Sequence, residues 1–231
     1  ARLADGSKIS LTQMTDYPWE GHIKVTLNDV ATHRPISLHF RVPGWTEKPV
    51  VRVNGVKTDV LPEPGSYLEV HRTWSAGDRI TLDFPMPVRL MQANPKITKL
   101  QNRVAIMRGP LVYCLELPKS EGGDDIFNNG VILPESIKLT PVHRPEFLGG
   151  VTVLKGKALT KEGKDAFLRT RGEPSHSVYN AAWRDGELYR PVTPVQSRLP
   201  EAGTVNVELI PYYAWANRGL AFMDVWVPLA R

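Results

Sequence analysis

Cysteine is nearly absent from this sequence: Cys114 is the only one among 231 residues. A single cysteine excludes a disulfide within the chain and a zinc site built from several thiolates. It favours neither a reducing nor an oxidising compartment, so the bacterial cytoplasm and the periplasm both stay open. No run approaches the roughly 18 apolar residues of a membrane-spanning helix, so we expect a soluble protein with no membrane partner. The chain begins at Ala1 without a signal-peptide pattern, as expected of a piece of a longer protein.

Helical periodicity and clustered charge are also scarce. The best helical candidates are two short segments, Glu162–Leu168 and Tyr212–Asn217. The net charge is +5, but the basic residues are scattered and mostly lie one or two positions from acidic ones. Because no contiguous basic face follows from this pattern, we expect no nucleic-acid partner.

The dominant pattern is an alternation of apolar and polar residues, which predicts half-buried antiparallel strands. It recurs in Lys8–Thr12, His22–Leu27, Ile36–Val42, Arg79–Phe84 and Thr204–Leu209. Asn54-Gly55 predicts a hairpin with a type I′ turn, because both central positions of that turn need positive φ. Many short strands separated by turns, with little helix, predict an all-β fold of two consecutive antiparallel β-sandwich domains.

We expect the boundary between the two domains near Gln92–Thr98, where a proline interrupts the strand pattern. Residues 1–95 would then form β-sandwich I and residues 96–231 β-sandwich II. The second domain contains two longer irregular stretches, Lys119–Asn129 and Leu168–Gln196. Loops of that length are uncommon unless they are functional or covered by a partner.

The histidines and the cysteine do not indicate catalysis or metal binding. The six histidines form no HExxH motif and no close pair with the cysteine. His39 and His71 fall at polar positions of alternating strands, which predicts solvated strand-face residues. Cys114 lies in an apolar run, where burial raises the pKa of a thiol, the wrong direction for a nucleophile.

Paired carboxylates are the remaining route to catalysis within this chain, because glycoside hydrolysis uses two of them. The candidates are Asp124, Asp125 and Glu116, whose separation in space does not follow from their spacing in the sequence. The glycine-rich stretch 121–130 offers oxygen ligands for calcium. It lacks the EF-hand spacing, so an exposed loop is the favoured interpretation. We assign no catalytic residue and no metal ligand.

Tryptophan is the other residue type that points to a ligand, since its ring packs well against the C–H faces of sugars. We expect most of the six tryptophans in the core or between domains. Trp183 is different, because it lies in the irregular stretch together with Tyr179 and Arg184. These three residues are the candidates for ligand or interface contacts.

Several short segments together carry a resemblance to a known family. They are Asp16–Trp19, Phe40–Trp45, Val51–Gly55, Gly65–Leu68, His71–Trp74, Pro85–Arg89, Val104–Glu116 and Pro211–Gly219. Their order and spacing resemble the C-terminal half of the β-L-arabinofuranosidase-type enzymes, glycoside hydrolase family 127. The resemblance covers nearly the whole chain and is weakest between about Lys119 and Pro200.

The resemblance implies two β-sandwiches that follow an (α/α)6 barrel, in which a zinc-bound cysteine thiolate is the nucleophile. Cys114 matches a sandwich strand and not that nucleophile, so no catalytic residue is carried over and zinc is expected in the missing barrel. The chain is thus expected to be the non-catalytic C-terminal region of a bacterial hydrolase. Its partners would be the barrel, plant-derived arabinose-containing glycans through the parent enzyme, and a second copy in a homodimer formed through the sandwiches.

Two other functions stay open beside this accessory role. A free-standing carbohydrate-binding module predicts a row of coplanar exposed aromatic rings on one sheet. A self-contained enzyme predicts two carboxyl groups facing each other in a cleft. The accessory role predicts an apolar face that the barrel covers in the parent. On that interpretation, we hypothesise that Leu168–Gln196 covers the mouth of the barrel.

Overall fold

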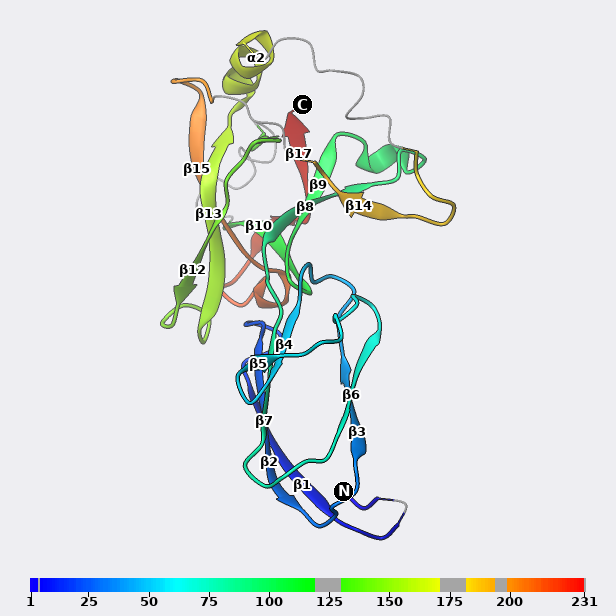
Figure 1. The fold of residues 1–231 in the computed structure, drawn as a ribbon. Helices are drawn as coiled ribbons and strands as arrows, with labels where there is room; N and C mark the ends of the chain where they lie inside the picture. Colours follow the sequence, from blue (N-terminus) through cyan, green and yellow to red (C-terminus); the bar gives the residue numbers. More distant parts are fainter. Residues whose placement is uncertain (4, 119–129, 171–181, 194–198, 231) are drawn as a thin grey trace. The chain divides into compact units, whose positions relative to one another are not determined.

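Strands dominate the structure, a computed structural model (Figure 1). The structure describes residues 1–3, 5–118, 130–170, 182–193 and 199–230. The chain forms two compact units, Ala1–Pro87 and Val88–Arg231. Within the described residues, α2 (Lys161–Thr170) is the one α-helix. The predicted all-β fold is confirmed. None of the described helices is long and apolar enough to cross a membrane.

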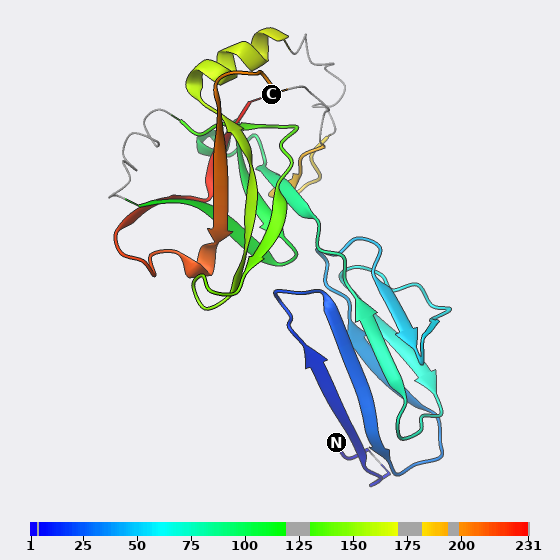
Figure 2. The same cartoon turned by 90° about the vertical axis from the view of Figure 1, so that its left-hand side faces the viewer.

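The first unit is a sandwich of two antiparallel sheets. Its strands are β1 (Ile9–Thr15), β2 (His22–Val30), β3 (Ile36–Arg41), β4 (Val50–Val53), β5 (Val56–Lys57), β6 (Tyr67–Arg72) and β7 (Arg79–Asp83). The larger sheet has the order β1-β2-β7-β4-β5, and the smaller sheet pairs β3 with β6 (Figure 2).

The alternating residues of these strands meet in one core. Leu27 of β2 and Ile80 of β7 are fully buried, and Leu68 of the opposite sheet belongs to the same cluster. Trp74 closes the cluster, and its indole N–H donates to the carbonyl of Ile36 at 3.1 Å. The buried indole thus keeps a hydrogen-bond partner, as buried polar groups require.

The predicted hairpin turn at Asn54-Gly55 is confirmed. The two residues have φ of 50° and 85°, and Val53 pairs with Val56 across the turn between β4 and β5. Positive φ at both central positions is the type I′ requirement from which the turn was predicted.

The second unit contains the remaining strands and α2. The strands are β8 (Val88–Ala93), β9 (Arg103–Arg108), β10 (Leu111–Pro118), β11 (Leu133–Pro134), β12 (Thr140–Arg144), β13 (Val151–Leu159), β14 (Tyr189–Pro191), β15 (Thr204–Pro211), β16 (Ala221–Asp224) and β17 (Trp226–Ala230). Two short 3-10 helices, η1 (Thr98–Leu100) and η4 (Tyr212–Ala214), complete the described elements.

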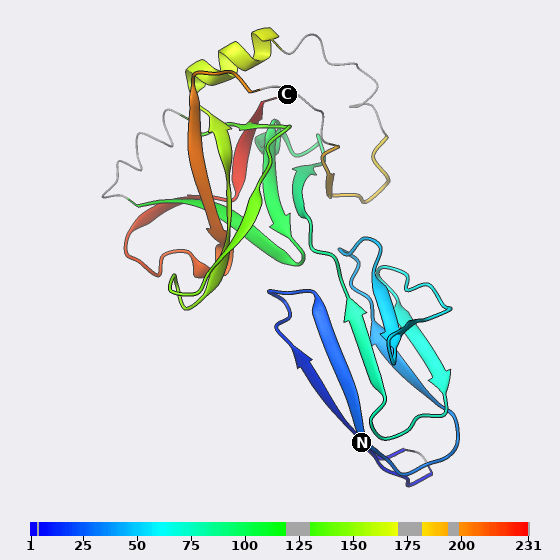
Figure 3. The ribbon, with the colours of Figure 1, turned by 60° about the vertical axis from the view of Figure 1, so that its left-hand side comes forward.

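A diverging hairpin divides the second unit into two layers. β9 and β10 pair only near their shared turn, from Leu111–Arg108 to Tyr113–Ile106. Beyond that point β9 pairs with β17, while β10 pairs with β16 and β15. One layer therefore reads β14-β8-β9-β17-β11, and the other reads β16-β10-β15-β13-β12 (Figure 3). The main apolar core lies between them and includes Ile106, Leu154 and Leu209.

The two units meet earlier in the chain than the expected Gln92–Thr98. β8 begins the second unit, because its two edges pair with strands of that unit. Val88–Gln92 of β8 pairs with β9 on one edge, and Met91–Ala93 of β8 pairs with β14 on the other. Of the two helical candidates, Glu162–Leu168 lies in α2, whereas Tyr212–Asn217 forms only the three-residue η4 and an extended turn. The segment is thus helical only in its first three residues, because the Ala216 N–H donates to the Glu116 side chain of β10 and the Asn217 side chain donates to the Ala214 carbonyl.

Candidate functional site: an aromatic loop anchored by a buried carboxylate

The segment between β15 and β16 forms the most distinctive exposed feature of the second unit. We call residues 212–220 the aromatic loop. β15 pairs with one edge of β10 and β16 with the other, since Leu115 is opposite both Leu209 and Asp224. The aromatic loop therefore crosses β10, and Figure 3 shows it beside the turn between β12 and β13.

Glu116 of β10 anchors the aromatic loop from below. Its side chain is only 2% exposed. One carboxylate oxygen accepts a hydrogen bond from the backbone N–H of Ala216 at 3.0 Å, and the other forms an ion pair with the guanidinium of Arg218. A buried carboxylate needs such partners, because an unpaired one loses its hydration without compensation.

Further contacts fix the shape of the aromatic loop. The side-chain N–H of Asn217 donates to the carbonyl of Ala214 at 3.1 Å, and Ala214 itself is buried. Ala216 has a φ of 64°, a conformation that a non-glycine residue keeps only when its surroundings hold it. The guanidinium of Arg218 also lies 4.7 Å from the centroid of the Phe147 ring. The aromatic loop is therefore held both by the Glu116 carboxylate and by the Phe147 ring.

The anchored loop presents large apolar side chains to solvent. The exposed fractions are 47% for Tyr212, 51% for Tyr213, 37% for Trp215 and 85% for Leu220. Aromatic residues on a pre-organised loop are typical of the anchors of protein interfaces, because they bury much area at little entropic cost. The aromatic loop is therefore suited to contact another protein surface.

The nearby nucleophile candidate is structural. Cys114 is fully buried under the aromatic loop with Ile210 and Ala214. Burial, with a further contribution from the charge of Glu116, raises the pKa of its thiol to about 12. The prediction of a buried cysteine is confirmed.

The carboxylate candidates do not form a described catalytic pair. Glu116 is committed to Arg218 and to the Ala216 amide. Asp124, Asp125 and most of the 121–130 stretch lie outside the described residues. In the part of the chain that the structure describes, no group of three or more His, Cys, Asp and Glu side chains is close enough to hold a metal ion.

Trp183 and Arg184, the sequence-predicted ligand candidates, lie in another part of the second unit. They line a pocket of about 400 Å³ with the turns Asn94–Lys96 and Asp185-Gly186. Tyr179 lies outside the described residues. His39 and His71 are exposed on β3 and β6, which confirms the prediction of solvated strand-face residues.

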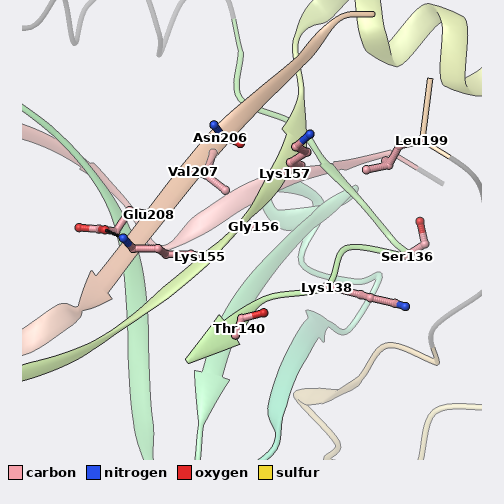
Figure 4. Close-up of a pocket in the computed structure, with 10 residues that line it drawn as sticks. All are labelled: Ser136, Lys138, Thr140, Lys155, Gly156, Lys157, Leu199, Asn206, Val207 and Glu208. Atoms are coloured by element: carbon pink, nitrogen blue, oxygen red, sulfur yellow. Dashed lines mark ion pairs between the residues drawn. The ribbon is translucent and has the colours of Figure 1, made fainter. Parts of the chain in front are cut away.

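A larger groove of about 710 Å³ runs along β13 and β15 (Figure 4). Lys138, Lys155 and Lys157 line it, and Lys155 pairs with Glu208 at 3.2 Å. Figure 4 shows Lys138 pointing away from this ion pair, so the lysine side chains of the groove do not converge on one position.

Exposed aromatic rings do not line up on one sheet. On the described strands the exposed aromatic residues are Tyr67 and Tyr189, one in each unit. Trp74 is buried and Trp45 packs between Tyr17 and Phe84, as expected of core tryptophans. The row of rings expected of a free carbohydrate-binding module is therefore not present on the described strands.

Comparison with known proteins identifies the family. The model for "Beta-L-arabinofuranosidase, GH127 middle domain" matches residues 1–86, and that for "Glycoside hydrolase family 127 C-terminal domain" matches residues 88–228. The chain belongs to glycoside hydrolase family 127. The two matches meet at the division between the two compact units.

Family 127 relatives are much longer than this chain. A non-reducing end β-L-arabinofuranosidase of Bifidobacterium longum subsp. longum is 29% identical over 95% of the chain and 30% of the relative. The crystal structure of a family 127 β-L-arabinofuranosidase from Geobacillus stearothermophilus T6 has a TM-score of 0.72 at 32% identity, over 97% of this chain and 31% of that one. A further glycoside hydrolase structure has a TM-score of 0.71 at 37% identity, over 96% of this chain and 32% of its own. The chain thus spans about a third of these relatives and is an accessory region of a family 127 glycoside hydrolase.

Proposed function

We propose that this chain is the non-catalytic C-terminal region of a β-L-arabinofuranosidase-like hydrolase. An (α/α)6 barrel earlier in the same polypeptide would carry the zinc–cysteine active site. The observation that carries the proposal is that the middle-domain and C-terminal-domain models together match residues 1–86 and 88–228, which leaves some two thirds of each relative outside this chain. The substrates would be arabinose-containing glycans, as the names of the relatives suggest.

The residues of the chain support this division of labour. Its one cysteine is a buried thiol with a pKa of about 12, which keeps it protonated near neutral pH. Glu116 is buried and engaged with Ala216 and Arg218 of the aromatic loop. Since the described residues offer no metal cluster, we assign no step through zinc to this chain.

We further propose that the aromatic loop packs against the remainder of the same polypeptide. The exposed Tyr213, Trp215 and Leu220 supply apolar area, and Glu116 holds the loop between them through Ala216 and Arg218. The occupant is the part of the hydrolase outside this chain, because that part is twice as long as the chain in the relatives. Residues outside the chain would then bury what this structure leaves exposed.

The test compares the same double substitution in two contexts. Tyr213→Ser with Trp215→Ser should lower the thermal unfolding midpoint of the full-length hydrolase by several degrees, because interface anchors contribute about 1–3 kcal/mol each. In the 231-residue chain alone the midpoint should fall by much less, since both side chains are partly exposed there. Val56→Ser, at an exposed turn of the first unit, is the matched control. Equal effects in both contexts, or none in the full-length protein, would contradict the docking.

A homodimer formed through the sandwiches stays a prediction, and light scattering of the full-length protein tests it. The hypothesis that Leu168–Gln196 covers the barrel mouth also stays a prediction, because much of that stretch lies outside the described residues. Deleting residues 171–181 from the full-length hydrolase should change its kinetics if the hypothesis holds.

A further inference from the structure

We propose that the second unit carries a carbohydrate-binding subsite built on Trp183, apart from the aromatic loop. Its ligand class is a single furanose or pyranose ring within an oligosaccharide. The proposal is independent of which sugar the parent enzyme cleaves.

The pocket has a size and composition suited to a sugar. Its volume of about 400 Å³ falls within the range of about 300–1,000 Å³ typical of small-molecule sites. The lining combines an indole and a proline ring with the polar groups of Lys96, Arg184 and Asp185. Aromatic faces stack on sugar C–H groups, while a carboxylate and cationic donors are suited to neighbouring hydroxyl groups.

Trp183 is held in place by the sheet beneath it. The guanidinium of Arg190 lies 4.1 Å from the centroid of the Trp183 ring, the geometry of a close cation–π contact. Arg190 belongs to β14, which pairs with Gln92 of β8. The indole is partly exposed and also lines the pocket, so it is fixed by Arg190 while it still presents surface to a ligand.

Asn94 joins the two turns that form the pocket. Its side-chain N–H₂ donates to the carbonyl of Glu187 at 2.9 Å, across 93 positions in the sequence, and its side-chain oxygen accepts from the N–H of Lys96 at 3.0 Å. The backbone N–H of Arg184 donates to the Glu187 carboxylate at 2.9 Å, which closes the second turn. The two turns are therefore held at a fixed separation before a ligand arrives, which lowers the entropic cost of binding.

The charge pattern favours a sugar over a polyanion. Asp185 lies within the same turn as Arg184, so a carboxylate is present among the cations that line the pocket. A phosphate-rich or strongly acidic ligand would meet that carboxylate, whereas hydroxyl groups accept from the cations and donate to Asp185 at once. The ring and the mixed charges together point to neutral carbohydrate.

Isothermal titration calorimetry on the 231-residue chain tests the proposal, with arabino-, xylo-, galacto- and gluco-oligosaccharides of two to five residues as probes. At least one probe should bind, and Trp183→Ala should weaken it by about tenfold or more, as expected when an aromatic anchor is removed. Asp185→Ala should also weaken it, and this second variant leaves the indole in place. Trp215→Ala, which removes an exposed indole from the aromatic loop, is the matched control and should bind the probe as tightly as the unsubstituted 231-residue chain does.

Two results would overturn the subsite. One is the absence of binding for all four classes of oligosaccharide by a chain with an intact circular dichroism spectrum. The other is binding that survives both Trp183→Ala and Asp185→Ala. Neither result bears on the accessory role, because that role rests on the family matches over residues 1–86 and 88–228 and is tested by hydrolysis and docking.

Discussion

We expect the two partners of the Glu116–Arg218 ion pair to differ in how much their substitution lowers the free energy of unfolding. Arg218→Ala leaves a carboxylate that is 2% exposed with the Ala216 amide as its remaining described partner, whereas Glu116→Gln leaves an arginine that is already 40% exposed. Breaking a buried ion pair costs about 3–5 kcal/mol, and the partial exposure of Arg218 reduces this to about 2–3 kcal/mol for Arg218→Ala. Glu116→Gln keeps the shape and one hydrogen bond, so we expect about 1–2 kcal/mol.

The asymmetry is measured in two ways. Urea unfolding of the 231-residue chain, followed by circular dichroism, gives the change in the free energy of unfolding. Hydrogen exchange then locates it: residues 212–220 should exchange faster in both variants, while the strands of the first unit stay protected. Arg218→Lys is the control, because it keeps the charge near Glu116. Equal costs for Arg218→Ala and Glu116→Gln, or no change in exchange within the aromatic loop, would refute the anchoring role.

Three more predictions follow from single residues. Cys114 should resist alkylation by iodoacetamide at pH 8 in the folded chain and react rapidly in urea, because burial raises its pKa to about 12; rapid reaction without urea would contradict its burial. Gly163→Ala should destabilise the second unit by more than about 2 kcal/mol in thermal unfolding, despite the better helix propensity of alanine. The reason is that the new Cβ would lie 1.8 Å from the carbonyl oxygen of Gly203. Lys161→Ala is the control, and an unchanged unfolding midpoint for Gly163→Ala would refute the close packing of α2. For Asp78, burial raises the pKa, but hydrogen bonds from Asn54 and from the N–H of Ser75 outweigh it and lower the net value. A lowered folded pKa gives stability that is present above the unfolded pKa and is lost as the pH falls through the folded one, so Asp78→Asn should cost stability at pH 7 and little at pH 2, and an equal cost at both would contradict it.

Local patterns predicted most of the first unit. The alternation in His22–Leu27 and Arg79–Phe84 follows from burial of one strand face, and Asn54-Gly55 follows from the φ values of its turn. These features depend on residues that are close together in the sequence, so they could be predicted without the structure.

The interactions that define the aromatic loop depend on residues far apart. Glu116 and Arg218 are 102 positions apart, and nothing local marks them as partners. Tyr212–Asn217 has a weak helical pattern, but the hydrogen bond from the Ala216 N–H to Glu116 of β10 holds it in another conformation after η4. A cluster of tyrosine and tryptophan followed by arginine is the local signal that could have marked this exposed aromatic segment.

The placement of β8 also depends on long-range pairing. Its sequence, Val88–Ala93, reads equally well as the last strand of the first unit or as the first strand of the second. Pairing with β9 and β14 decides the matter, and β14 lies about a hundred residues away. Trp183 could be predicted as a ligand candidate from its neighbours in the sequence. Its pocket could not be predicted, because the pocket depends on contacts with Asn94, far away in the sequence.

We propose that this chain does no hydrolysis and that the rest of its polypeptide does. The most direct measurement is hydrolysis of an aryl β-L-arabinofuranoside, with zinc and a reductant present, by the 231-residue chain and by the full-length hydrolase side by side. We expect turnover by the full-length protein and none by the 231-residue chain. Turnover by the chain alone would contradict it and return Glu116, Asp124 and Asp125 to consideration as catalytic groups.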